Sequence, residues 1–473
     1  MDKKSFKKYV EKFFNYNTLP TLMNFVRIPN LSPAYDPEWN TNGLQLKAAN
    51  LIASFAKSLN FKNGEINIIQ DKGYTPLVFI EIAASRENDN RTVLFYAHFD
   101  KQPHGTGWDP DKGPITPVII DNHLYGRGSV DDGYASFSIL TAIKACQDHN
   151  CLLPRICCIF EGAEESTDEH LNYYFDKLLS VLGENVVAFI PLDSGCSTYD
   201  RMWLTSSLRG VIDFNINVQT LDDDFNHGAD ANGRAAENFF ILRKVMDGIM
   251  DNTTGNIKIS EFHLDEIPSD KLAQLEKEVE IVGDKYFDDI PTYPGVNPLK
   301  TDVKEAMINN RWEPTFILLG IDNCPQISEN GFSAKKSMNV KVSMRIPPGI
   351  DVNKAVEALK TSINENTYLN TKVTCEIGNE NISEGWELKN FSNRMTEILN
   401  QGSKEFFGNE VIFRGEGGSI PFISYFQTKY PNCDIICTGV CGIDGNEHSA
   451  NENLNLDAAK KMILVLCYML TEI

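Results

Sequence analysis

Residues 93–100 read Val-Leu-Phe-Tyr-Ala-His-Phe-Asp, an apolar run that passes directly into an imidazole and a carboxylate. A short apolar run bounded by polar residues is typical of a buried parallel strand. In open α/β sheets the ligand crevice lies outside the carboxyl ends of such strands. This stretch therefore predicts a buried strand that carries His98 and Asp100 to the functional edge of a sheet.

Three other apolar runs, at residues 156–160, 186–192 and 434–439, are also followed by polar groups. The groups concerned are Glu164, Glu165, Asp193 and His448. Because carboxyl ends of parallel strands meet at one edge of a sheet, we expect these side chains to gather in a single crevice. Imidazoles and carboxylates together predict a hydrolytic metal site.

The pattern of elements divides the 473 residues into two domains. Residues 1–206 alternate helical and strand-like segments, which is typical of a parallel sheet covered by helices. Residues 207–219 and 337–346 instead alternate apolar and polar residues, which predicts antiparallel strands with one solvated face. We expect a catalytic domain at residues 1–206 and 383–473, interrupted by an α+β domain at residues 207–382. The predicted helices include residues 40–59, 132–148, 235–250, 269–282 and 351–364.

Composition excludes several classes of partner. The net charge of −21 argues against binding to nucleic acid or to anionic lipid, both of which require a basic face. No run of about 18 apolar residues is present, so we expect no membrane span. The 11 cysteines contain no Cys-x-x-Cys pair and predict free thiols in the reducing cytoplasm.

The spacing of His98 and Asp100 suits a metal ligand with its orienting partner. Residues two apart on a strand point to the same face. A carboxylate there can accept a proton from one imidazole nitrogen while the other nitrogen binds metal. Taken alone, such a pair is more often an ordinary surface contact.

A glycine-rich turn at residues 125–133 carries Asp131 into a predicted helix. A phosphate-binding loop or a helix N-cap by Asp131 or Asp132 would share this pattern. The turn lacks the P-loop lysine and the Gly-x-Gly-x-x-Gly spacing, which argues against a nucleotide. A carboxylate at this point could instead bridge two cations.

Glu164 and Glu165 are adjacent carboxylates after a buried strand. Such groups repel each other and are costly to bury without a cation or a proton. Their side chains leave in different directions, so that one can bind metal while the other holds a water molecule. With Asp168 and Glu169 nearby, a solvated acidic turn is the alternative interpretation.

Two histidines and three carboxylates suit Zn²⁺, with Mn²⁺ or Co²⁺ possible in a similar geometry. The order of these motifs resembles the two-metal peptidase family that includes carnosinases and other cytosolic dipeptidases, carboxypeptidase G, aminoacylase, and the acetylornithine and succinyl-diaminopimelate deacylases. The motifs concerned are His98-x-Asp100, Gly126-Arg-Gly-x-x-Asp131, Glu164-Glu165, Asp193 and His448. The resemblance covers essentially the whole chain and implies a zinc-peptidase-like mixed sheet flanked by helices, with an inserted lid domain that forms dimers.

The same resemblance implies a role for each residue of the site. His98 and Asp193 would hold one ion, Glu165 and His448 the other, and Asp131 would bridge the two. Asp100 would orient His98, and Glu164 would act as general base and acid.

Three further positions resemble parts of the family's substrate site. His227 is similar to a lid histidine that stabilises the oxyanion, often in the site of a partner subunit. Arg345 is similar to an arginine that clamps the substrate carboxylate, and Gly418 and Ser419 lie in a sequence like the family's glycine-rich substrate loop. Each could also be an ordinary loop or strand residue.

The leading interpretation is a dipeptidase or carboxypeptidase-like enzyme that hydrolyses small peptides as a cytoplasmic homodimer. The alternatives are an N-acyl amino-acid deacylase, such as succinyl-diaminopimelate desuccinylase, and a catalytically silent binding protein. One departure concerns the helix start, where many members carry Asp-Asp-Lys-Gly or Asp-Asn-Lys-Gly. Here Asp131-Asp132 is followed by Gly133-Tyr134, which leaves the subfamily open.

Overall fold

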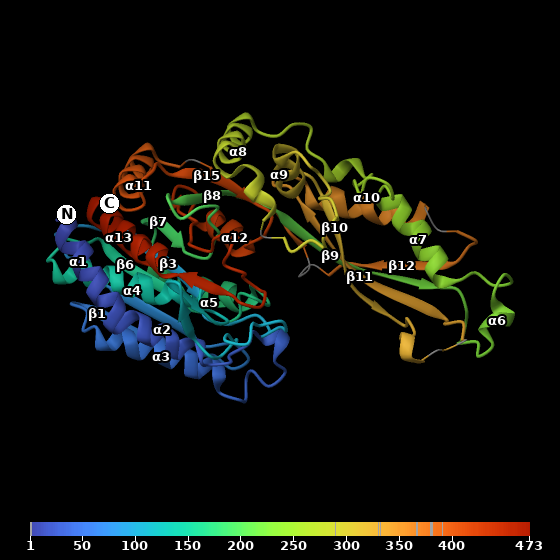
Figure 1. Ribbon diagram of the computed structural model, residues 1–473, viewed down its shortest axis with the longest axis horizontal. Helices are drawn as coiled ribbons and strands as arrows, with labels where there is room; N and C mark the ends of the chain where they lie inside the picture. Colours follow the sequence, from blue (N-terminus) through green and yellow to red (C-terminus); the bar gives the residue numbers. More distant parts are fainter. Residues whose placement is uncertain are drawn as a thin grey trace.

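The computed structural model describes residues 2–288, 290–329, 331, 333–365, 368–378, 382–389 and 391–473. Figure 1 shows two lobes along the long axis. Both termini lie in one lobe, the body, and the helices α7 and α10 with the strands β9–β12 form the other, the lid.

The body is built around a six-stranded mixed sheet in the order β1-β2-β6-β3-β7-β16. Strands β3, β6, β7 and β16 are parallel to one another. At one edge of the sheet β2 pairs antiparallel with β6, and β1 pairs antiparallel with β2. The predicted last strand at residues 434–439 is reduced to the two residues of β16. The strands are β1 (Gly64–Ile69), β2 (Leu77–Ile82), β3 (Thr92–His98), β6 (Arg155–Glu161), β7 (Val186–Pro191) and β16 (Asp434–Ile435).

Helices cover both faces of this sheet. Every residue of β3 is buried, and the consecutive residues Phe95 and Tyr96 belong to different apolar cores. Because successive side chains of a strand point to opposite faces, each face must have its own helical cover. The body helices are α1 (Lys3–Phe13), α2 (Leu19–Val26), α3 (Leu44–Ser58), α4 (Gly133–Asp148), α5 (Glu169–Leu182), α11 (Asn393–Phe406), α12 (Pro421–Lys429) and α13 (Leu456–Glu472).

The lid sheet has the order β10-β11-β9-β12 and is antiparallel. Strand β9 alternates buried and less buried residues, and its buried side chains pack with helices α7 and α10 in one core. The elements are β9 (Gly210–Gln219), α6 (Gly228–Ala231), α7 (Asn238–Ile249), β10 (Thr315–Asp322), β11 (Ser337–Ile346), α10 (Val352–Glu365), β12 (Lys372–Glu376) and β13 (Ile382–Ser383).

Part of the inserted sequence packs on the body side of the lid strands. Helices α8 (Ser269–Val282) and α9 (Val303–Arg311) share a core with Trp203 of β8. In Figure 1 both helices lie close to where the lobes meet, with α9 on the side of the lid. The small sheet beneath them consists of β14 (Trp386–Glu387), β8 (Trp203–Leu208) and β15 (Ile412–Glu416).

Two predictions about composition can be compared with the structure. All eleven cysteines are free thiols, as expected. Within the described residues, no helix combines the length and the apolar character that a membrane span requires.

Candidate metal centre

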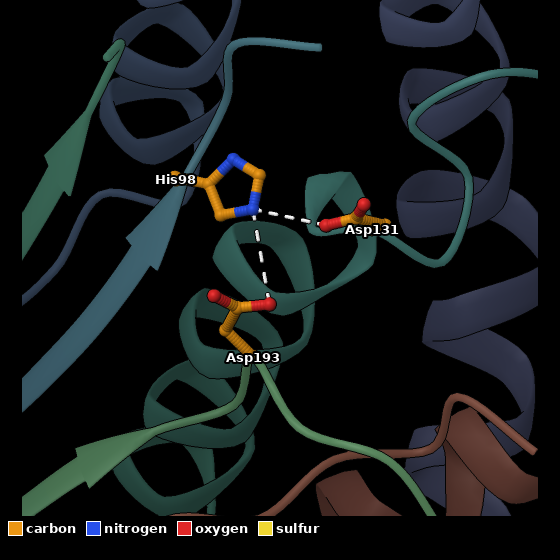
Figure 2. A group of neighbouring side chains, drawn as sticks. All are labelled: His98, Asp131 and Asp193. Atoms are coloured by element: carbon orange, nitrogen blue, oxygen red, sulfur yellow. Dashed lines mark hydrogen bonds and ion pairs between the residues drawn. The ribbon is translucent and has the colours of Figure 1, made fainter. Parts of the chain in front are cut away.

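The first group of potential metal ligands joins two strand ends to the glycine-rich turn. His98 is the last residue of β3, Asp193 follows β7, and Asp131 precedes α4. Figure 2 shows the three side chains pointing toward one another. His98 Nε2 lies 3.0 Å from Asp131 Oδ1 and 3.8 Å from Asp193 Oδ1.

The second group uses the other oxygen of the same aspartate. His448 Nε2 lies 2.9 Å from Asp131 Oδ2 and 3.4 Å from Glu165 Oε2. The donor atoms within each group lie close enough to share one ion. The two groups therefore meet at Asp131, which directs one carboxylate oxygen to each.

Asp100 and Asp132 hold His98 in place. Asp100 Oδ1 lies 3.4 Å from His98 Nδ1, while the backbone N–H of His98 donates to Asp132 Oδ2 at 3.3 Å. The carboxylate of Asp100 also accepts the backbone N–H groups of Glu164 and Glu165, at 3.2 and 3.1 Å. Asp100 thus links the ring of His98 to the acidic pair and leaves Nε2 facing the first group.

Carboxyl groups outnumber basic groups at this edge of the sheet. Burial, with Asp193 as the next cause, raises the pKa of Glu164 well above its usual value. Burial and Asp131 raise the pKa of Glu165 to about 8 against the opposing effect of His448. Although burial would lower the pKa of His448, its contacts with Asp131 and Glu165 raise it to about 12.

The donor set fits divalent cations. Glu165 Oε1 is buried and has no hydrogen-bond partner among the described residues. Buried carboxylates need either protons or a cation, and mixed imidazole and carboxylate donors are those that Zn²⁺, Mn²⁺ and Co²⁺ accept. The arrangement therefore supplies two sets of donors with one shared carboxylate.

A buried ion pair that sequence reasoning missed fixes the bridging aspartate. Glu452 accepts the backbone N–H of Asp131 at 3.3 Å on one oxygen and pairs with Arg127 at 2.7 Å on the other. Arg127 also donates to the carbonyl of Ser449, at 3.1 Å. The pair joins the glycine-rich turn to the loop of His448. In the sequence, the arginine between Gly126 and Gly128 was the feature that could have indicated this ion pair.

The antiparallel pairing of β17 (Asn453–Asn455) with β5 (His123–Tyr125) supports the same connection. Strand β4 (Val118–Ile120) completes this small sheet. It brings the segment after His448 beside the segment before Asp131.

A second residue that sequence reasoning missed, Lys101, lies beside the glycine-rich turn. Lys101 is buried, its Nζ donates to the carbonyls of Phe25 and Ile28 at 3.0 and 2.8 Å, and it lies 4.2 Å from the centre of the Phe25 ring. A Cβ at Gly133 would collide with that ring and with the carbonyl of Gly128. A Cβ at Gly128 would likewise collide with the side chain of Lys101. Phe25 therefore leaves no room for a side chain at position 133, and Lys101 leaves none at position 128.

Two arginines meet at the junction of body and lid. Arg345 of β11 donates to Ser419 Oγ at 2.8 Å. Arg209, which sequence reasoning missed, donates from Nε to the carbonyl of Gly417 at 2.9 Å and from its backbone to Gly418 at 3.0 Å. Burial and the charge of Arg345 lower the pKa of Arg209 to about 10. The cluster is suited to an anion such as a carboxylate.

His227 does not join the metal centre within one chain. It precedes α6, which Figure 1 places at the end of the lid farthest from the body. Its side chain is 69% exposed, and Nδ1 accepts the backbone N–H of Asp230 at 3.3 Å.

Comparison with known proteins identifies relatives over most of the chain. The family model described as peptidase family M20/M25/M40 matches residues 94–472. The Cys-Gly metallodipeptidase dug1 of Schizosaccharomyces pombe is 27% identical over 435 residues, which cover 85% of this chain and 84% of that protein.

Two solved structures show the same fold. Human carnosine dipeptidase 1 has a TM-score of 0.82 at 19% identity and covers 100% of this chain and 98% of its own. The di-peptidase Dug1p of Saccharomyces cerevisiae has a TM-score of 0.81 at 21% identity, with coverage of 99% and 98%. Both alignments include the body and the lid.

Proposed function

The chain belongs to peptidase family M20/M25/M40, and on that basis we propose that it is a metal-dependent dipeptidase. The observation that carries this conclusion is the pair of ligand groups that share Asp131. Relatives named as a Cys-Gly metallodipeptidase and a Beta-Ala-His dipeptidase support a dipeptide substrate. They do not favour an N-acyl amino-acid deacylase.

We assign two ions to the site. His98 and Asp193 would hold one, Glu165 and His448 the other, and Asp131 would contact both. Zn²⁺ suits these nitrogen and oxygen donors, and Mn²⁺ or Co²⁺ could replace it. When bound, such ions lower the pKa of a water molecule and polarise a carbonyl group.

The chain's own residues would carry the proton and orient the substrate. We assign Glu164 as the general base, which would accept a proton from water and return it to the leaving amine. Its position next to Glu165, with its backbone N–H bound to Asp100, supports this role. Asp100 would hold the ring of His98 in the orientation in which its Nε2 faces the metal. Arg345, with Ser419 and the backbone at Gly418, would hold the substrate's terminal carboxylate.

We further propose that the lid, residues 207–382, joins two copies of the chain, and that residues 1–206 and 383–473 form the catalytic domain. The exposed position of His227 supports a role in the site of a second copy, where it would stabilise the oxyanion. Strand β10 lies at a sheet edge and exposes Ile317, Leu318 and Leu319 by 46 to 51%. Apolar side chains on an edge strand favour pairing with another chain. The free thiols suit the cytoplasm.

Glu164→Gln provides the direct test. We expect the zinc-loaded variant to lose at least about a thousandfold in kcat for dipeptides, because a general base and an acid step are both removed. Its metal content should equal that of the wild type. Asp168→Asn, a nearby carboxylate outside both ligand groups, serves as the matched control.

A set of substrates distinguishes a dipeptidase from an N-acyl amino-acid deacylase and from a silent binding protein. Dipeptides and the corresponding N-acetyl and N-succinyl amino acids should be offered to the same sample. Turnover confined to the N-acyl compounds would overturn the dipeptidase assignment, and a metal-loaded wild type without any turnover would favour a silent binding protein.

A further inference from the structure

A cavity of about 290 Å³ lies directly beside the metal centre. Its lining includes Gly195, two residues after Asp193, and Glu447, the neighbour of His448. Glu416 and Arg414 of β15 form another part of the wall. We propose that this cavity receives the N-terminal residue of the dipeptide, that Glu416 and Glu447 select its free ammonium group, and that Gly195 sets the size of its side chain. This inference rests on the proposed dipeptidase function.

The carboxylate of Glu416 is held rigidly at the cavity wall. Its Oε1 accepts hydrogen bonds from Ser194 Oγ at 2.7 Å, Thr205 Oγ1 at 2.9 Å and the backbone N–H of Gly195 at 3.3 Å. All of these bonds go to the same oxygen. The carboxylate is thus anchored through Oε1 next to the segment that carries Asp193, and Oε2 takes no part in these three bonds.

The charges around the cavity favour a cation. Arg414 lies between two carboxylates, with Nε 3.7 Å from Glu278 Oε1 and 3.8 Å from Glu416 Oε1. Glu278 also pairs with the buried Arg311. These two arginines and two glutamates balance, and Glu447 adds a further carboxyl group to the cavity wall. An ammonium group would be attracted and an N-acyl group would not.

The distance between the two ends of the proposed substrate site matches a short peptide. Glu416 and Ser419 are three residues apart, so their Cα atoms can be separated by no more than about 10 Å. Ser419 and Arg345 form the carboxylate end of the site, and Glu416 forms the ammonium end. Two residues of an extended peptide span about 7 Å and fit within this limit, whereas four residues span about 13 Å and exceed it.

Gly195 determines how much of the cavity is open. A Cβ built at this position would lie 3.4 Å from Arg414 Nη1, 3.4 Å from the carbonyl of Cys441 and 3.7 Å from Glu416 Oε1. These are tolerable contacts, and Gly195 does not have a positive φ angle. A larger side chain would therefore extend into the cavity without requiring an unfavourable backbone conformation.

The size prediction is tested with Gly195→Ala and Gly195→Leu. Leu-Gly, Gly-Gly and Gly-Leu should be compared, with Tm and zinc content measured for each variant. We expect Gly195→Leu to lose about tenfold or more in kcat/KM for Leu-Gly, because a filled pocket excludes the first side chain. Gly-Gly and Gly-Leu should change much less, and Gly195→Ala should give an intermediate loss for Leu-Gly.

The charge prediction is tested with Glu447→Gln, and Asp444→Asn on the same loop is the matched control because it does not line the cavity. Glu447→Gln should lower kcat/KM for Ala-Gly by about tenfold while the residual rate on propionyl-Gly, which lacks the amino group, stays the same. Asp444→Asn should change neither.

The possible results distinguish this inference from the proposed function. Wild-type chain that turns over no dipeptide would overturn both. Wild-type turnover of dipeptides with equal losses for all three peptides in Gly195→Leu, or with no loss for any, would overturn the cavity assignment alone. Parallel losses on Ala-Gly and propionyl-Gly in Glu447→Gln would overturn the role of that carboxylate.

Discussion

At the strand ends of the body, His98 is completely buried between three carboxylates, whereas His227 at the tip of the lid has 69% of its side chain exposed. The buried group contacts Asp100, Asp131, Asp132 and Asp193, which lie on three separate segments of one chain. The exposed group contacts only its own turn among the described residues. One chain therefore brings together both groups of candidate metal ligands, whereas we propose that His227 acts in the substrate site of a second copy.

The largest expected effect comes from removing the residue common to both ligand groups. Asp131→Ala should lose both ions and at least about a thousandfold in activity, because each group would keep only two of its three donors. Metal analysis after dialysis measures the loss. Asp109→Ala, an exposed aspartate on another loop, is the control. Two ions retained by Asp131→Ala would contradict the shared-ligand assignment.

Disruption of the lid edge should affect activity without affecting metal. Leu319→Lys places a charge on the exposed strand β10, so we expect a monomer that has lost about a hundredfold in kcat/KM, the effect of removing an oxyanion donor. Mass measurement in solution and metal analysis distinguish the two properties. Leu152→Lys, at an exposed leucine of the body, is the matched control.

Mixing two inactive chains gives an independent test of the same contact. A mixture of His227→Ala and Glu164→Ala should recover activity, because one site of the mixed dimer would contain both an intact Glu164 and an intact His227. A fully active monomer, or a mixture without recovery, would place the whole site within one chain.

A smaller effect is expected from the buried ion pair behind the bridging aspartate. Glu452→Gln keeps the shape but removes the charge that pairs with Arg127. We expect metal affinity to fall by about ten- to a hundredfold, as is usual for groups that orient metal ligands. An unchanged affinity, measured by competition with a chelator, would show that the turn is held without this pair.

The smallest expected effect is a loss of stability on replacing either of two buried lysines. Lys101 and Lys271 both donate to backbone carbonyls, but Lys101 lies beside the turn of Asp131 and Lys271 lies on α8. Each Lys→Met variant should lose about 1–3 kcal/mol of stability, because carbonyls lose a buried donor. Only Lys101→Met should also weaken metal binding. Equal metal affinities would mean that Lys101 has a structural role alone.

The comparison also shows what could be predicted from the sequence. Apolar runs with polar ends located His98, Asp193 and the acidic pair, because strand direction alone brings such groups to one edge. The bounds of β11 and α8 agree with the periodic patterns at residues 337–346 and 269–282. Local patterns were sufficient wherever the packing partner is the adjacent element.

Other features depended on contacts between distant segments. Glu452 acts on a turn more than 300 residues earlier, and Lys101 contacts the end of α2. Arg209 followed the alternating pattern of a strand and gave no separate signal. Nothing in the local pattern of α8 and α9 revealed that they pack beside β8 and β15.

We propose that two ions share Asp131 in a centre formed by one chain. The most direct measurement is the anomalous scattering of a crystal of the zinc-loaded protein, with the metal content of the same sample. We expect two peaks, one between His98, Asp131 and Asp193 and one between Asp131, Glu165 and His448. A single peak without contact to Asp131, or zinc bound at other residues, would contradict the account.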